Sequence, residues 1–359
     1  MKLLFDIRCL VQPKTGIQVV TENMLHELLR MRHHLGVILL ACPTQRPQLE
    51  EFSGDIIWTA ISQYDFFHQR QVAKIINDSA CDVYLSPTYF IPQGLLKPFI
   101  ATVHDIIPRR VWLGKATLYL YFFLAGTLKR ALAVWTVTQY SMRQITAVYP
   151  GVAGKIHVVP SGICEPRTES ESPKEIYTLM LFASRFRHKN VLFGRQVFQQ
   201  LQRLSGRRWH LHVIGSPQST EAFATDENVT VHGRMDDAQL RQLYLKSWGL
   251  LIPSLEEGFS LPLLEGMNFD CLVFYHRHTA MSEVAGEGGI GLDIDHALVW
   301  AEAIQKYADD EELARSVRLR GRERAALYTS ERFASAFQSS LRRSTERLMD
   351  GSLTRSQAA

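Results

Sequence analysis

Two glutamates eight residues apart, Glu257 and Glu265, stand in the segment PSLEEGFSLPLLEGM, which begins at Pro253. A short apolar run ends at Pro253. We therefore expect a strand, a loop and then a helix with Pro262 near its first position, where the missing N–H of proline has no helical partner to lose. The backbone N–H groups of the loop then point toward a ligand, and the positive end of the helix lies behind them. This arrangement predicts a diphosphate site. Its loop residues are Gly258, Phe259, Ser260 and Leu261.

The same two carboxylates invite a second interpretation as a catalytic pair. A glycosidase uses two such groups as acid and nucleophile about 5–10 Å apart. Here we expect Glu257 in the loop and Glu265 about one turn into the helix, so that both face one cleft without meeting at one point. The spacing favours two separate binding contacts over a joint acid–base pair. A surface loop with incidental acids is the plainer alternative, which the combined glycine, proline and acids disfavour.

Two cations, Arg185 and Lys189, lie in the run ASRFRHKN, directly after an apolar run. Positive charge at the end of a strand suits a diphosphate whose negative charge grows as a bond to it breaks. Arg187 stands between them and could share this role. A solvated basic loop is the alternative.

Short apolar runs alternate with helical patterns along almost the whole chain. The strands and helices that these patterns predict must position the acids and cations described above. Continuous apolar runs are typical of strands buried on both faces, as in a parallel sheet covered by helices. The expected strands are Lys2–Ile7, Ile56–Ile61, Val83–Ser86, Phe99–Val103, Val134–Val137 and Ile156–Val159 in the first half, and Thr178–Ala183, His210–Ile214, Val229–His232, Leu250–Pro253, Leu272–Tyr275 and Gly291–Ile294 in the second.

A polar segment rich in charge, serine and proline, EPRTESESPKE, separates the two alternating halves and reads as a linker. The chain is therefore expected to form two doubly wound α/β domains, 1–165 and 176–330, joined by a linker at 166–175. Residues 331–359 are expected to form a helix and tail that cross back toward the first domain. In such sheets ligands lie beyond the carboxyl ends of the strands. Gly16 and His104 occupy that position in the first domain.

Composition narrows the class of protein. The 359 residues are 46% hydrophobic and 21% charged, with a formal net charge of +4, which is too weakly basic to indicate nucleic-acid binding. Five scattered cysteines without a CxxC pair argue against a disulfide framework or a zinc site. No secretory signal is expected, and the longest uncharged apolar run, Ala116–Leu128, is shorter than the about 20 residues of a spanning helix. We expect a cytoplasmic protein.

Several segments, in a fixed order over nearly the whole chain, match the motifs of one known family. With the E-x7-E spacing of Glu257 and Glu265, they resemble the retaining glycosyltransferase family 4 (glycosyl transferases group 1). The matching segments are Thr102-Val103-His104-Asp105, Gln139-Tyr140-Ser141, Tyr149-Pro150-Gly151, Pro160-Ser161-Gly162-Ile163, Val229–Gly233 with Asp236, Asp237 and Leu240, and Ser282-Glu283-Val284-Ala285-Gly286.

The resemblance implies the GT-B fold, in which two Rossmann-like doubly wound domains face a central cleft. It implies a nucleotide-diphosphate sugar as co-substrate, held mainly on the second domain, and an acceptor held mainly on the first. Glu257 then contacts the donor sugar hydroxyls and Glu265 the ribose hydroxyls, while Arg185 and Lys189 take the leaving charge. His104 is implied to bind and orient the donor sugar.

The resemblance also implies that the loop of Gly16 approaches the donor phosphate. Two positions depart from the family pattern. Gln18 stands where a second glycine is frequent, and Ser184 replaces the glycine before Arg185, whose spacing to Lys189 is four rather than five. These departures keep open a non-catalytic role as a sugar-nucleotide-binding partner in a polysaccharide assembly complex.

No metal or other cofactor is expected. Asp293 and Asp295 spell a DxD motif, but their place after the last strand resembles a turn of the family. His276 and His278 lack an apparent third ligand. Glu283 is expected to be structural. A nicotinamide oxidoreductase is disfavoured because no G-x-G-x-x-G follows any expected strand.

The partners follow from the resemblance and from one further segment. The expected acceptor is a growing glycan or a lipid-linked acceptor in surface polysaccharide biosynthesis, such as lipopolysaccharide or exopolysaccharide, with a mannose-type hexose favoured as the transferred sugar. The basic and aromatic segment 111–135 is consistent with peripheral contact at the inner face of the cell membrane, or equally with a core helix.

Overall fold

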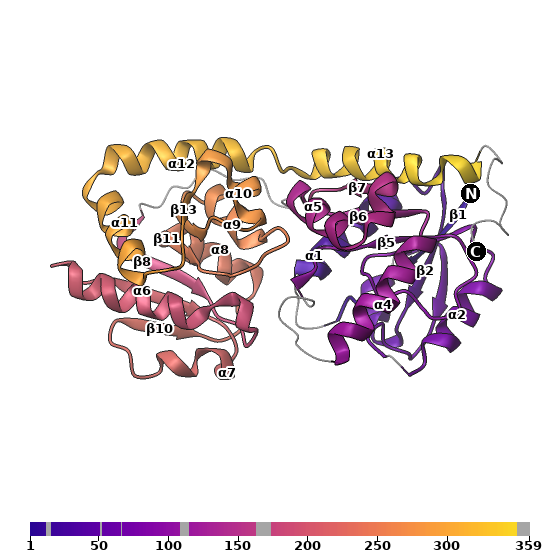
Figure 1. Ribbon diagram of the computed structural model, residues 1–359, viewed down its shortest axis with the longest axis horizontal. Coiled ribbons are helices and arrows are strands. Elements are labelled where there is room, and N and C mark those ends of the chain that lie inside the picture. Colours follow the sequence, from indigo (N-terminus) through magenta and orange to yellow (C-terminus); the bar gives the residue numbers. More distant parts are fainter. Residues whose placement is uncertain (12–15, 51, 66, 108–114, 163–173, 350–359) are drawn as a thin grey trace. The chain divides into compact units, whose positions relative to one another are not determined.

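The computed structural model describes residues 1–11, 16–50, 52–65, 67–107, 115–162 and 174–349, apart from the side chains of residues 47, 48, 115–122 and 347. The chain divides into two compact units (Figure 1). Unit 1 combines Met1–Gly162 with the C-terminal segment that begins at Ser330, and unit 2 comprises Ile163–Thr329. Each unit is built on one sheet with helices around it.

Unit 1 contains a seven-stranded sheet in the order β3-β2-β1-β4-β5-β6-β7. All paired strands are parallel, and the chain starts in the middle of the sheet, moves to one edge and then crosses back to the other. This is the doubly wound arrangement that continuous apolar runs predict. The strands are β1 (Lys2–Asp6), β2 (Gly36–Ala41), β3 (Asp55–Trp58), β4 (Val83–Ser86), β5 (Phe99–Thr102), β6 (Ala133–Thr136) and β7 (Ile156–Val158).

Helices bury apolar stripes against both faces of this sheet. Side chains of α1 and α13 join one core cluster, whereas side chains of α2, α4 and α5 join the other. Alternate residues of β1 divide between the two clusters, since Leu3 and Phe5 belong to the first and Leu4 to the second. The helices are α1 (Gly16–Arg30), α2 (Gln69–Asp78), α4 (Lys115–Arg130), α5 (Gln139–Val148) and α13 (Ser330–Met349), with 3-10 turns η1 (Pro43–Leu49) and η2 (Pro150–Lys155).

The last helix, α13, is part of unit 1 although it follows all of unit 2 in sequence. It packs against α1 and β7. Phe337 is fully buried and meets the ring of Trp135 edge to face at 5.3 Å. The indole N–H of Trp135 donates to the hydroxyl of Ser344 at 3.1 Å. The helix therefore completes the core of unit 1.

Unit 2 contains a six-stranded parallel sheet in the order β10-β9-β8-β11-β12-β13. The strands are β8 (Glu175–Phe182), β9 (His210–Ile214), β10 (Val229–His232), β11 (Ser247–Ile252), β12 (Leu272–His276) and β13 (Ile290–Leu292). The helices are α6 (Val191–Leu204), α7 (Pro217–Thr220), α8 (Asp237–Lys246), α9 (Leu261–Asn268), α10 (Ala280–Ala285), α11 (Ala297–Asp309) and α12 (Glu311–Ala325), with 3-10 turns η3 (Arg187–Lys189), η4 (Glu221–Phe223) and η5 (Gly286–Gly288).

The predicted fold class, two parallel-sheet α/β domains, is confirmed, although several elements differ from the predicted ones, as β2, β3, β8 and β11 do. Strand β2 was not predicted, although its sequence, GVILLA, is a continuous apolar run of the kind that marks a buried strand. Strand β3 ends at Trp58 rather than at Ile61, and the carbonyl of Ile61 accepts a hydrogen bond from Arg8. The predicted linker falls largely on residues 163–173, which lie outside the described part, and β8 begins at Glu175.

Among the helices in the described part of the chain, none combines the length and apolar character that crossing a bilayer requires. The predicted membrane-contact segment, 111–135, begins in residues outside the described part, and the side chains of 115–122 are outside it as well. Its backbone from Lys115 to Arg130 forms α4.

Candidate active site

An ion pair links the two loops that follow β8 and β11 of unit 2. The Lys189 ammonium lies 2.7 Å from Glu257 Oε1, and the Glu257 side chain is only 10% exposed. A charge-assisted hydrogen bond of this length compensates for removing the carboxylate from water. The backbone ties the same two loops together, because the N–H of Leu255 donates to the carbonyl of His188 at 2.7 Å. Two predicted site residues are thereby brought into direct contact.

The loop of Glu257 leads into α9 through a backbone conformation that is uncommon outside glycine. Ser260 has φ 74° and precedes α9, and no side-chain hydrogen bond from Ser260 caps the helix. Pro262 lies in the first turn, as predicted. Serine rarely adopts the left-handed backbone conformation. Where it does, surrounding contacts fix the conformation, and such residues cluster at functional sites. Phe259 supplies such surroundings, since its buried ring meets Tyr328 edge to face at 5.6 Å.

Gly258 and Leu261 complete the predicted phosphate loop, one before Phe259 and one as the first residue of α9. The helix that follows approaches the sheet closely, because a Cβ on Gly266 would lie 2.9 Å from side chains of Leu250 and Val273. The absence of a side chain at Gly266 thus lets α9 lie close to the sheet, and this distance determines where the neighbouring Glu265 lies.

Glu265 is positioned by a buried phenol. The Tyr244 hydroxyl, from α8, donates to Glu265 Oε2 at 2.8 Å. Burial raises the pKa of Tyr244 well above its ordinary value and the charge of Glu265 raises it further, so the phenol keeps its proton and acts as the donor. The ring stacks on Phe269 at 5.6 Å. The buried Tyr244 hydroxyl therefore orients the Glu265 carboxylate. The spacing of residues in the sequence does not reveal this contact.

Arg185 and Lys189 follow β8 in the same loop but have different surroundings. The Arg185 guanidinium lies 5.5 Å from the centre of the Phe186 ring. The loop turns at η3, which contains both Arg187 and Lys189. Between them, His188 stacks with Phe186 at 5.8 Å, and its pKa is lowered by burial and by the neighbouring ammonium. The basic loop carries these aromatic contacts, while Arg185, Phe186 and Arg187 are exposed.

His104 lies in unit 1, just beyond β5. Its Nε2 is 2.9 Å from the carbonyl oxygen of Pro87. A carbonyl can only accept, so Nε2 carries the hydrogen, and Nδ1 of the neutral ring is the accepting nitrogen. Burial lowers the pKa of His104, which favours this neutral form. The ring can therefore receive a hydrogen bond from a hydroxyl group.

Gly16 is the first residue of α1, and residues 12–15 before it lie outside the described part. Gln18, which stands where the family often has glycine, is 4% exposed. Its side-chain amide donates to the carbonyls of Cys9, at 3.0 Å, and Val11. The Gln18 side chain thus holds the loop after β1 in place.

Residues weighed for metal binding or structure have other contacts. Asp293 lies 2.8 Å from His278 Nε2 and 3.4 Å from Arg277 Nε, which places the first acid of the DxD motif in an ion-pair cluster. The backbone carbonyl of Glu283 accepts from Arg324. No group of three or more metal-ligating side chains was found among the described residues.

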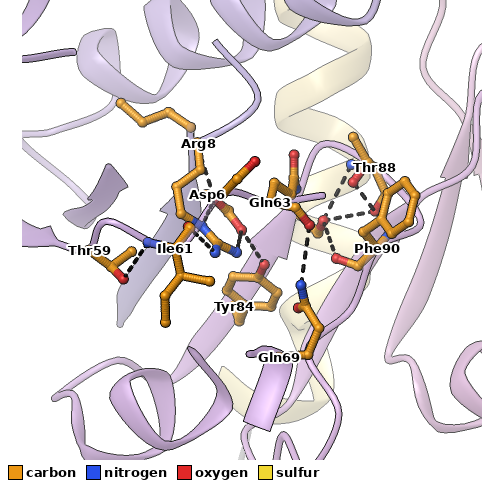
Figure 2. Close-up of polar contacts among 12 residues, drawn as sticks. Asp6, Arg8, Thr59, Ile61, Gln63, Gln69, Tyr84, Thr88 and Phe90 are labelled. Atoms are coloured by element: carbon orange, nitrogen blue, oxygen red, sulfur yellow. Dashed lines mark hydrogen bonds and ion pairs between the residues drawn. The ribbon is translucent and has the colours of Figure 1, made fainter. Parts of the chain in front are cut away.

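One buried polar cluster was not predicted. Arg8 and Asp6 form a fully buried ion pair at 2.7 Å, and the Tyr84 hydroxyl donates to the same carboxylate at 2.6 Å (Figure 2). The Arg8 guanidinium also donates to the carbonyl of Ile61 at 3.0 Å, which fixes the loop after β3. Two opposite charges two residues apart in an apolar run, FDIRCL, are the signal that could have indicated this pair.

The comparisons with known proteins agree with this architecture. The model "Glycosyl transferases group 1" matches residues 166–324, and the model "Glycosyltransferase Family 4" matches residues 14–165. O-antigen chain mannosyltransferase B of Escherichia coli is 23% identical over 287 residues, which cover 70% of this chain and 71% of that protein. O-antigen chain mannosyltransferase RfbU of Salmonella typhimurium is 27% identical over 220 residues, which cover 59% and 61%, respectively.

Among solved structures, Anabaena Alr3699/HepE in complex with UDP and glucose is 16% identical, with a TM-score of 0.72 and coverage of 95% of this chain and 99% of that one. At this identity the likeness shows the fold alone. The two family models together span most of the chain. The protein therefore belongs to the group 1 glycosyl transferases and is a glycosyltransferase of the GT-B fold.

Proposed function

We propose that this enzyme moves a hexose, with mannose favoured, from a nucleotide-diphosphate sugar to a growing glycan or a lipid-linked acceptor in surface polysaccharide biosynthesis, with retention at the anomeric carbon. The mannose and the pathway are supported by the two relatives named as O-antigen chain mannosyltransferases. The predictions of a cytoplasmic location and of peripheral membrane contact through 111–135 belong to the same proposal.

The observation that carries the proposal is the Lys189–Glu257 pair beside the N-terminus of α9. Glu257 would accept hydrogen bonds from donor sugar hydroxyls, while Lys189 and Arg185 would face the diphosphate. The N–H groups of Gly258 to Leu261, together with the positive N-terminal end of α9, would also attract the negative charge of the diphosphate. Glu265, held by Tyr244, would accept from the ribose hydroxyls.

The reaction forms a bond from an acceptor hydroxyl oxygen to the anomeric carbon and breaks the bond from that carbon to the phosphate oxygen. The acceptor hydroxyl proton passes to the departing phosphate on the same face, and the nucleoside diphosphate leaves. Lys189 and Arg185 would stabilise the developing charge. No metal is required in this scheme. His104, neutral with Nδ1 accepting, would orient a hydroxyl of the donor sugar.

The test is a donor screen with GDP-mannose, UDP-glucose, UDP-N-acetylglucosamine and dTDP-rhamnose in the presence and absence of EDTA. We expect one donor to raise the melting temperature, because a ligand that binds only the folded state stabilises it by mass action. The same donor should release nucleoside diphosphate in wild type but not in Glu257→Gln, and EDTA should not change the rate. If no nucleotide sugar shifts melting or turns over, the proposal is wrong.

A non-catalytic sugar-nucleotide-binding role is the second candidate. The observation that favours it is Gln18, whose amide occupies the loop where the family often has glycine. Its signature would be a nucleotide sugar that shifts melting in wild type, with nucleotide release equal in wild type and Glu257→Gln. A rate that depends on Glu257 excludes it.

A further inference from the structure

The loop at residues 257–261, the α9 loop, packs on an aromatic ring from a distant part of unit 2. Tyr328 lies in the turn that follows α12, where its backbone N–H donates to the carbonyl of Ala325 at 2.9 Å. Its half-buried ring meets Phe259 edge to face, with ring centres 5.6 Å apart and planes at 76°. Phe259 is 7% exposed and directly precedes Ser260, whose φ is 74°. Tyr328 therefore packs next to the residue with the strained backbone.

The Tyr328 ring is itself held by an arginine on α12. Arg324 donates to the Tyr328 hydroxyl at 3.1 Å, and its guanidinium carbon lies 5.4 Å from the centre of the ring. The same guanidinium donates to the carbonyl of Val284 at 2.8 Å and to that of Glu283. Both carbonyls belong to the last turn of α10, where helix carbonyls need partners from outside the helix. Arg324 thereby links Tyr328 to the end of α10.

Close backbone packing keeps Arg324 and the rest of α12 in place. Gly286 has φ 53°, and a Cβ at this position would lie 3.2 Å from Arg324 Nε. A Cβ on Gly288 would lie 2.6 Å from the Cα of Gly321 on α12, so a larger residue would push α12 away. Helix α12 also packs against α9, the helix that the α9 loop enters (Figure 1). The support of Tyr328 is therefore part of the close-packed interior of unit 2.

This support matters because the α9 loop must present several N–H groups in one arrangement. Ser260 gives α9 no side-chain cap, so the packing of the neighbouring Phe259 carries much of the constraint on this backbone. A loop that is ordered before binding does not have to be ordered by its ligand, which improves affinity. If the ordered loop is only partly populated, the apparent Kd rises by the inverse of that fraction.

We propose that Tyr328 is a positioning residue for the donor: its ring, held by Arg324, fixes Phe259 and so keeps the N–H groups of residues 258–261 in the arrangement that binds a diphosphate. Tyr328 acts through Phe259 and needs no contact of its own with the nucleotide sugar. All of these groups belong to unit 2. The inference rests on the proposed function, because it takes the ligand of the α9 loop to be the diphosphate of the donor.

Isothermal titration calorimetry on the full-length protein with GDP, UDP and dTDP tests this role. We expect wild type to bind at least one of them and Tyr328→Leu to bind it about three- to tenfold more weakly, which corresponds to about 0.6–1.4 kcal/mol and matches one aromatic pair. Tyr328→Phe keeps the ring and should stay within about twofold of wild type. Leu327→Ala, at a 39% exposed position of the same turn, is the matched control and should bind as wild type does.

Three further measurements separate positioning of the loop from general stability. The double variant with Phe259→Leu should bind about as weakly as the weaker single variant, because both substitutions remove the same contact. In the nucleotide-release assay, the donor KM of Tyr328→Leu should rise with kcat nearly unchanged, because saturating donor restores the ordered loop. Amide hydrogen exchange of ligand-free Tyr328→Leu should be faster at residues 258–261 and unchanged in β8.

The inference is overturned if Tyr328→Leu binds the nucleotide as well as wild type does, or if Tyr328→Phe or Leu327→Ala loses as much affinity as Tyr328→Leu. It is also overturned if the losses of the two single variants add in the double variant, if kcat falls at constant KM, or if exchange becomes faster throughout unit 2. The proposed function fails in a different way: wild type then binds none of the three nucleotides, which refutes the inference as well.

Discussion

The Lys189 ammonium and the Glu257 carboxylate meet at 2.7 Å although 68 residues separate them in sequence. The loops after β8 and β11 bring them together because these two strands are neighbours in the unit 2 sheet. The proposed cation for phosphate and the proposed acid for sugar hydroxyls are thereby placed in one contact, and the strength of that contact can be measured.

Removal of Lys189 should affect both stability and turnover. In Lys189→Met the largely buried Glu257 carboxylate loses its partner, which should cost about 1–3 kcal/mol of unfolding free energy. Loss of a cation at the departing phosphate should lower kcat about 100- to 1000-fold. Urea unfolding and nucleotide-release assays measure the two effects. Lys189→Arg keeps the charge and should retain most of the stability; an equal loss in both variants would contradict the ion-pair explanation.

Tyr244→Phe should weaken donor binding more than it slows the chemical step. The substitution removes the hydrogen bond to Glu265 and keeps the buried ring. A hydrogen bond to a charged group contributes about 1.5–3 kcal/mol, so we expect a donor KM at least about tenfold higher, with a smaller change in kcat. Tyr307→Phe, on α11 of the same unit, is the matched control and should leave KM unchanged. A fall in kcat at constant KM would refute a positioning role for Tyr244.

Gln18→Gly restores the residue that the family often carries but should destabilise unit 1. The variant loses two side-chain hydrogen bonds to the loop after β1, and we expect the unfolding free energy to fall by about 2–4 kcal/mol. His26→Gly, at an exposed position of the same helix, should cost only about 1 kcal/mol through helix propensity. Equal urea midpoints for the two variants would show that the Gln18 amide does not stabilise the loop.

The fully buried Asp6–Arg8 pair should be sensitive to loss of one partner. Arg8→Met leaves the Asp6 carboxylate buried without its cation and should reduce stability by about 3–5 kcal/mol. The double variant Asp6→Asn with Arg8→Met removes both charges and should recover part of that loss. If the double variant is as unstable as the sum of the two single variants, the pair does not act as a coupled unit.

Three histidines on β9 and β10 should make unit 2 sensitive to acid. His212 Nδ1 lies 3.0 Å from His232 Nε2, and the His210 and His212 rings are 4.8 Å apart. Burial, and then His210 and His232, lower the pKa of His212 to about 4. The unfolded chain takes up this proton near pH 6.5 and the folded chain only near pH 4, so stability should fall as the pH drops through that interval.

Melting temperatures measured from pH 7 to pH 4 test this expectation. His212→Gln removes the titrating ring and should flatten the acid loss. His33→Gln, at an exposed position of unit 1, is the control and should keep the wild-type slope. A slope unchanged in His212→Gln would assign the acid sensitivity to other groups.

Much of the fold and the main site loop could be predicted from the sequence. Continuous apolar runs mark strands buried on both faces, and their alternation with helical patterns determines two parallel-sheet domains. The strand, loop and proline around Glu257 and Glu265 likewise follow from local residue preferences. Helix α13 also shows its apolar stripe, Phe333, Phe337 and Leu341, in the sequence.

Only the tertiary structure decided which groups meet. Lys189 reaches Glu257, and Tyr64 reaches Phe90, because parallel strands distant in sequence end at the same edge of a sheet. Tyr244 on α8 reaches Glu265 on α9 through the packing of the helices. Such pairings depend on strand order and on helix depth, which Gly266 sets through the space it leaves against Leu250. Local sequence periodicity predicts neither the strand order nor how closely a helix packs on the sheet. The sequence by itself determined the helices and strands and the functional side chains that they carry. The packing of those elements decided which residues position these side chains.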